Sequence, residues 1–78
     1  MLNEMITKAK ELLNDNDLVI LNYAETEDYY LFAYGTKDGK PTFDNTMIKV
    51  DKKTGNASYY IITSHLKEIN KLRFKDAK

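Results

Sequence analysis

The chain offers few side chains that could perform catalysis. His65 is the only histidine, and cysteine is absent from the 78 residues. A catalytic histidine needs a partner within hydrogen-bond reach, and a histidine metal site needs further ligands. Glu68 lies one helical turn from His65 and can simply pair with it. We therefore expect His65 to lie at a helix start or on the surface, outside any catalytic or metal site.

The motifs that mark common enzyme classes are also missing. The sequence has no glycine-rich phosphate loop, no serine-centred elbow and no pair of histidines at helical spacing. With three glycines and one histidine, few residues remain to build a preorganised active site. We predict that the protein is not an enzyme and that it uses no cofactor and no metal.

Three acids, Glu25, Glu27 and Asp28, cluster between two apolar segments. A calcium loop needs alternating oxygen ligands and a fixed glycine, which this cluster lacks. A solvated hairpin loop is the favoured interpretation. A docking patch for a basic partner is the alternative, because complementary charge accelerates association.

The C-terminal segment is rich in lysine. Helical spacing would place Lys67, Lys71, Lys75 and Lys78 along one flank, as in a phosphate-binding stripe. The segment holds a single arginine, Arg73, and its acids dilute the positive charge. We favour a solvated helix face over a phosphate site.

Residues 29–34 are all apolar or aromatic. In a strand, Tyr30, Phe32 and Tyr34 would lie on one face and Tyr29, Leu31 and Ala33 on the other, so both faces would be apolar. Cross-strand tyrosine pairs stabilise exposed strand faces, which is one explanation. The other is an open aromatic face that binds a protein, since aromatic anchors dominate binding hot spots. We predict a protein-binding surface made of the acidic loop and one strand face: Glu25, Glu27, Asp28, Tyr30, Phe32 and Tyr34. The opposite face, with Tyr29, is the alternative.

The elements that must position these residues follow from periodicity. Apolar residues recur every three or four positions in the first segment, which predicts a helix with Asn3 as its N-cap. Later segments are rich in β-branched and aromatic residues or alternate with a period of two, which is typical of strands. Gly55 should take a left-handed conformation in a hairpin loop. The predicted order is a helix that ends at residue 13, strands at 18–24, 29–34, 43–51 and 57–62, and a closing helix capped by Thr63 or Ser64.

Composition limits the remaining possibilities. Lys plus Arg equals Asp plus Glu at 12 each, so no bulk charge favours nucleic acid or an anionic membrane. No apolar run approaches the roughly 20 residues that span a bilayer, and no signal peptide is visible. We expect one cytoplasmic domain covering residues 1–78. Acids dominate the first 36 residues, by seven to two, and bases dominate the rest, by ten to five.

The segment from Ile48 to Ala57 reads IKVDKKTGNA: an apolar strand that ends in aspartate, two variable residues, Thr-Gly and a new strand. This pattern looks like PepSY-like and cystatin-like small domains. With the aromatic strand before it and the Leu66–Ile69 segment after it, residues 28–72 resemble the immunity protein 35 family. The chain departs from that family's habits because Tyr30 or Phe32 replaces a tryptophan. It also has Thr63-Ser64 where a Gly-Pro-rich approach is usual.

The resemblance implies a small cytoplasmic bacterial protein that neutralises a toxin by binding it, with no catalytic residues. The expected fold is α+β and cystatin-like: an N-terminal helix packed on a four-stranded antiparallel sheet and a short C-terminal helix, with helices on one face. The alternative function is a self-associating structural or regulatory module of phage or mobile-element origin. A carrier of a small ligand is a third class of function, but no cluster of polar residues in the sequence supports it. The expected core is Leu2, Ile6, Ala9, Leu13, Leu18, Ile20, Leu31, Ile48, Val50, Ile61, Leu66 and Ile69.

Overall fold

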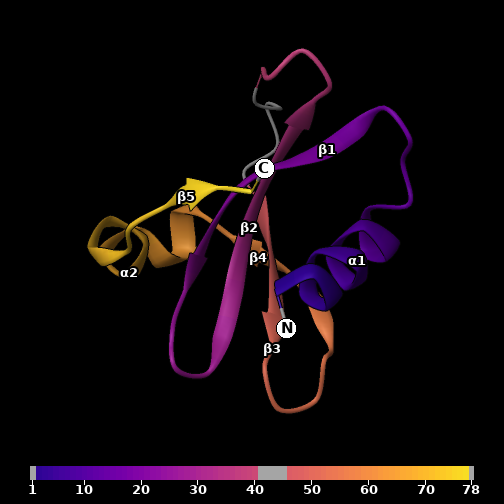
Figure 1. The fold of residues 1–78 in the computed structure, drawn as a ribbon. Helices are drawn as coiled ribbons and strands as arrows, with labels where there is room; N and C mark the ends of the chain where they lie inside the picture. Colours follow the sequence, from indigo (N-terminus) through magenta and orange to yellow (C-terminus); the bar gives the residue numbers. More distant parts are fainter. Residues whose placement is uncertain (1, 41–45, 78) are drawn as a thin grey trace.

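The computed structural model describes residues 2–40 and 46–77, which form an antiparallel sheet with short helices around it (Figure 1). The sheet order is β4-β3-β2-β1-β5. The elements are α1 (Leu2–Leu13), β1 (Leu18–Glu25), β2 (Tyr29–Thr36), β3 (Thr46–Asp51), β4 (Ala57–Ile61), a 3₁₀ turn (Thr63–His65), α2 (Leu66–Lys71) and β5 (Lys75–Asp76). The α+β class is therefore confirmed. The part of the predicted third strand at 43–45 lies outside the described residues.

The sheet has five strands, so the expectation of four is wrong. α2 ends at Lys71, and Leu72 takes an extended conformation with φ −87° and ψ 149°. The chain then runs back along the free edge of β1, where Asn22 pairs with Asp76 and Tyr23 with Lys75. A two-residue strand is too short to produce a periodic pattern in the sequence.

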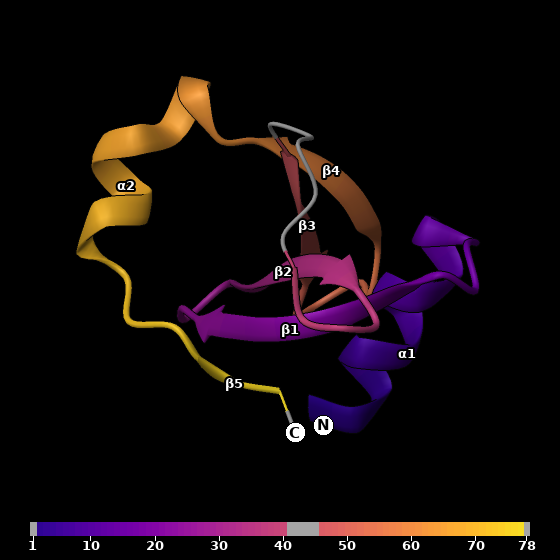
Figure 2. The same cartoon turned by 90° about the horizontal axis from the view of Figure 1, so that it is seen from above.

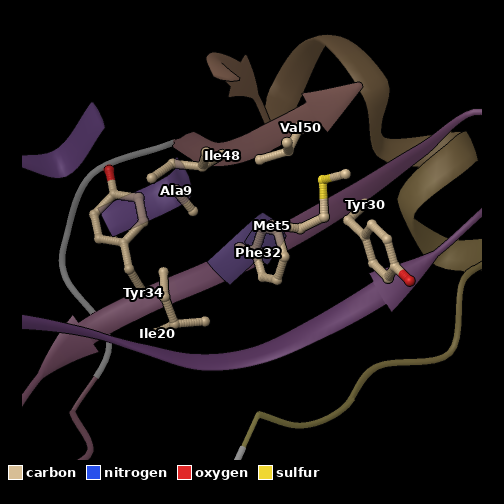
Figure 3. Close-up of a cluster of buried hydrophobic side chains, with 8 residues drawn as sticks. All are labelled: Met5, Ala9, Ile20, Tyr30, Phe32, Tyr34, Ile48 and Val50. Atoms are coloured by element: carbon tan, nitrogen blue, oxygen red, sulfur yellow. The ribbon is translucent and has the colours of Figure 1, made fainter. Parts of the chain in front are cut away.

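α1 covers one face of the sheet and buries the main core against it. Residues that pair across strands share a face, and Phe32 pairs with Ile48 on one side and Tyr23 on the other. α1 contributes Met5 and Ala9 to this face (Figure 3). The cluster consists of Met5, Ala9, Ile20, Tyr30, Phe32, Tyr34, Ile48 and Val50.

The predicted core is mostly correct. Five of its members are buried: Ala9, Ile20, Leu31, Ile48 and Val50. Four more are half-buried and pack against the cluster: Leu2, Ile6, Leu13 and Leu18. Ile69 is half-buried. Ile61 and Leu66 are 49% and 50% exposed, so their assignment to the core is wrong.

The second helix lies on the opposite face, and the expectation that both helices share one face is wrong. Tyr60 pairs with Met47 and alternates with Tyr59, so its side chain lies on the face away from α1. There its hydroxyl donates to Glu68 Oε2 at 2.8 Å, and its ring stacks on His65 with centroids 4.1 Å apart. Figure 2 shows α1 and α2 on different sides of the β1–β2 hairpin.

The turns follow the local chemistry of their residues. Gly55 has φ 75°, which confirms the predicted left-handed position, and Asp51 accepts the backbone N–H groups of Lys53 and Thr54. The predicted helix caps are wrong. α1 already begins at Leu2, so Asn3 lies inside the helix, where its carbonyl accepts the Thr7 hydroxyl. The N-cap of α2 is His65, because residues 63–65 form a 3₁₀ turn first.

Candidate functional site

The aromatic residues of the predicted binding surface lie in the core. Tyr30, Phe32 and Tyr34 are 5%, 0% and 6% exposed, so the expectation that they form an open face is wrong. The physical reason is that α1 covers this face of β2. The Tyr34 hydroxyl lies 2.6 Å from Thr46 Oγ1, and the Tyr30 and Phe32 rings stack at 5.8 Å.

The opposite face of β2 is also closed. Leu31 is fully buried there, and Tyr29 is half-buried beside the Tyr60 ring, with centroids 6.3 Å apart. Lys49 places its ammonium 4.7 Å from the centre of the Tyr29 ring. Neither face of β2 therefore presents free aromatic anchors, and the predicted continuous patch of acids and aromatics does not form.

The acidic residues occupy the tip of the β1–β2 hairpin, as predicted. Glu25, Glu27 and Asp28 are exposed. Thr26 organises the tip, because its hydroxyl bonds to the carbonyl oxygen and the N–H of Tyr29 at 3.0 and 3.1 Å. A docking role for these acids stays a prediction.

Glu25 is tied to the β3–β4 loop. Lys52 Nζ donates to Glu25 Oε2 at 2.6 Å, and the same ammonium lies 4.9 Å from the centre of the Tyr30 ring. The hydrogen bond from Lys52 holds the pKa of the Glu25 carboxyl below its ordinary value. Burial, with Glu25 nearby, raises the pKa of the Tyr30 phenol.

His65 has structural partners. Its ring is half-buried against Tyr60, and its Nδ1 lies 2.9 Å from the carbonyl oxygen of Ile61. Glu68, which we expected to pair with His65, instead accepts the Tyr60 hydroxyl. Within residues 2–40 and 46–77, no group of three or more His, Asp or Glu side chains is placed to hold a metal ion. No helix in the described part of the chain is long and apolar enough to cross a membrane.

The exposed large apolar side chains of the described residues all lie between positions 59 and 66. Tyr59, Ile61 and Leu66 are 52%, 49% and 50% exposed. The first two lie on β4, which forms one edge of the sheet. Sequence reasoning missed this site because it placed Ile61 and Leu66 in the core. The adjacent Tyr59 and Tyr60 were the available signal, since both faces of that strand are apolar.

A cleft of about 670 Å³ opens between the tip of the β1–β2 hairpin and the chain that leaves α2. Its lining includes Tyr23 and Glu27 from the β1–β2 hairpin, and Lys71 and Arg73 from the C-terminal segment. The acid-rich first half of the sequence and the base-rich second half therefore face each other here. The predicted helical stripe of lysines does not continue to Lys75, because α2 ends at Lys71, and Lys78 lies outside the described residues.

Comparison with family models, curated proteins and solved structures finds no match to this chain. The resemblance to the immunity protein 35 family therefore stays a prediction.

Proposed function

We propose that this protein is a non-enzymatic binding module whose partner is another protein, and that the partner contacts the edge strand β4. The observation that carries the proposal is the exposure of Tyr59 and Ile61, about half of each side chain, on the outermost strand of the sheet. Aromatic and large aliphatic side chains supply most of the free energy in protein–protein interfaces.

The backbone of β4 supports the same proposal. β4 pairs with β3 on one side, and no described strand pairs with its other side. The strand reads Ala-Ser-Tyr-Tyr-Ile and has no charge, no proline and no glycine. Natural sheets protect exposed edges with charged residues and proline, and an edge that lacks them accepts an added strand. A partner strand would gain backbone hydrogen bonds there and bury Tyr59 and Ile61.

The resemblance to the immunity protein 35 family favours a toxin as the partner, and a cytoplasmic setting in which the toxin is neutralised by direct binding. The acidic hairpin tip supports this choice. A toxin that cuts nucleic acid needs a basic site, and an acidic rim would accelerate its encounter with this protein at low salt.

Calorimetric titration against the protein encoded beside this one tests the proposal. Tyr59→Ala and Ile61→Lys should each weaken binding by more than about 1 kcal/mol while leaving the melting curve close to that of the wild type. Leu66→Ala is the matched control, because Leu66 is equally exposed but lies outside the strand. Unchanged affinity in both β4 variants would contradict the proposal.

Self-association through β4 is the second candidate. If two copies pair antiparallel about Tyr59, Ala57 lies opposite Ile61 and Ser58 opposite Tyr60. Each small side chain then meets a large one, and no like charges oppose each other. Sizing at micromolar concentration separates the two candidates. A tight dimer that Ile61→Lys disrupts favours self-association, and a clean monomer favours a different protein as the partner.

A further inference from the structure

The cleft beside the acidic hairpin carries a second inference, independent of β4. It is bounded by the end of β1 and by the extended chain between α2 and β5, which Figures 1 and 2 both show passing beside β1. Its volume of about 670 Å³ lies within the range of small-molecule sites.

Three cations line this cleft, one from the end of α2 and two from the chain that follows it. Lys71 is the last residue of the helix, and Arg73 and Lys75 lie on the chain that follows it, which becomes extended at Leu72. All three line the cleft and are exposed. Within the described residues, none of them forms an ion pair.

The lining as a whole holds four cations and two carboxylates, a formal excess of two positive charges. Lys52 also lines the cleft, but Glu25 neutralises that ammonium at 2.6 Å. Glu27 is the one lining acid that forms no ion pair among the described residues. Three unpaired cations therefore face one unpaired carboxylate, and the cleft attracts an anion that carries more than one charge.

An aromatic side chain also lines the cleft. Tyr23 is half-buried and packs against Tyr30 and Phe32, with ring centroids 6.2 and 6.4 Å apart. Because those two rings belong to the core, the ring of Tyr23 is held in place. A rigid aromatic ring stacks well on a planar group of a ligand.

We propose that this cleft binds a mononucleotide, with the phosphates on Lys71, Arg73 and Lys75 and the base against Tyr23. Arginine supplies a planar fork of donors that matches a phosphate group, and the lysines add point charges. Glu27 is placed on the lining to accept hydrogen bonds from an amino or hydroxyl group of the ligand.

Calorimetric titration of the full chain at low salt tests the proposal with three probes: adenosine diphosphate, pyrophosphate and adenosine. Adenosine diphosphate should bind at least fivefold more tightly than either of the others, because it alone uses both the cations and Tyr23. Absence of saturable binding up to millimolar adenosine diphosphate would overturn the proposal. Pyrophosphate binding as tightly as adenosine diphosphate would overturn the role of Tyr23.

A matched pair of variants locates the site. Arg73→Gln should weaken binding of adenosine diphosphate at least fivefold, whereas Lys67→Gln should change it less than twofold. Lys67 is an exposed cation of the same segment that does not line the cleft. Equal losses in the two variants would indicate general charge attraction and would sink the proposed site. Both positions are exposed, so a melting curve close to that of the wild type is expected for each.

Discussion

β2 and β4 present side chains in one row on the same face of the sheet, yet their environments differ completely. Phe32 of β2 pairs with Ile48 of β3, which pairs with Tyr59 of β4. Phe32 and Ile48 are fully buried, whereas Tyr59 is 52% exposed. α1 contacts β4 as well as the three strands before it, and Ala57 at the start of β4 packs against the core, but Tyr59 and Ile61 farther along the strand stay about half exposed.

This difference shows what alternation in a sequence encodes. A period of two assigns side chains to the two faces of a strand, and it does so correctly for both β2 and β4. It does not say which strand lies in the middle of the sheet or how far a helix extends over it. Burial depends on both, so two strands with similar patterns have different roles.

The largest effect should come from truncating the central aromatic residue. Phe32→Ala removes a fully buried ring and should lower the free energy of unfolding by about 3–5 kcal/mol, which is most of the stability of so small a domain. Tyr59→Ala removes a ring in the same row and should cost less than about 1 kcal/mol. Urea titrations followed by circular dichroism measure both values. Similar costs for the two variants would contradict the described coverage by α1.

A second effect comes from Gly35 near the end of β2, where neighbouring atoms leave no room for a side chain. A methyl group added at Gly35 would meet the carbonyl oxygen of Lys40, and Leu21 Cδ1 at 2.6 Å. The carbonyl of Lys40 also accepts the N–H of Thr36, so it cannot move freely. Gly35→Ala should therefore lower the free energy of unfolding by about 1–3 kcal/mol.

Ser58→Ala on the exposed edge strand is the comparison for Gly35→Ala. Ser58 is exposed, and its replacement should change the free energy of unfolding by no more than about 0.5 kcal/mol. A larger loss of unfolding free energy in Ser58→Ala than in Gly35→Ala would contradict this difference between the two strands.

Much of this arrangement could be predicted from the sequence, and most of the errors concern how distant elements stack. The first helix, the predicted strands as far as the structure describes them and the hairpin loop at Gly55 follow from local chemistry, and the structure confirms them. Three predictions were wrong: that Tyr30 and Tyr34 are exposed, that Ile61 and Leu66 are buried, and that both helices share one face. Each of these depends on how distant elements stack. β5 and the cleft beside it depend on where α2 stops. No residue near Lys71 marks that position, because the lysine spacing continues past it.

A third effect separates the two neighbouring tyrosines of β4. Burial, followed by the hydrogen bond to Glu68, raises the pKa of Tyr60 above its ordinary value of 10. Above about pH 10 the unfolded chain loses this proton while the folded chain keeps it, so stability falls as the pH rises. Tyr60→Phe should cost about 1 kcal/mol at pH 7, since it loses one hydrogen bond, and should make the alkaline decline shallower.

The control for Tyr60→Phe is Tyr59→Phe, which removes an exposed hydroxyl from the adjacent residue. Urea unfolding at pH 7, 10 and 11 measures the slope for each protein. The slope of Tyr59→Phe should follow that of the wild type. The burial of Tyr30 also raises the pKa of its phenol, so part of the alkaline decline should remain in Tyr60→Phe. An unchanged slope in Tyr60→Phe would contradict a buried hydroxyl at this position.

The smallest effect concerns the exposed tip of β1–β2, where the chain relies on charge rather than on burial. Lys52 holds the pKa of Glu25 below its ordinary value of 4.5, so the folded state favours the carboxylate. This contribution is present above pH 4.5 and is lost as the pH falls through the lowered pKa. Glu25→Gln should therefore destabilise the protein slightly at pH 7 and bring it closer to the wild type at pH 3. Salt at 1 M should shrink the difference at pH 7, because the pair is partly solvated.

Glu27→Gln is the control. Glu27 is an exposed acid on the same tip and forms no ion pair among the described residues, so its replacement should leave stability unchanged at both pH values. Equal effects at Glu25 and Glu27 would mean that the tip acts through its total charge, and that the contact between Glu25 and Lys52 contributes nothing of its own.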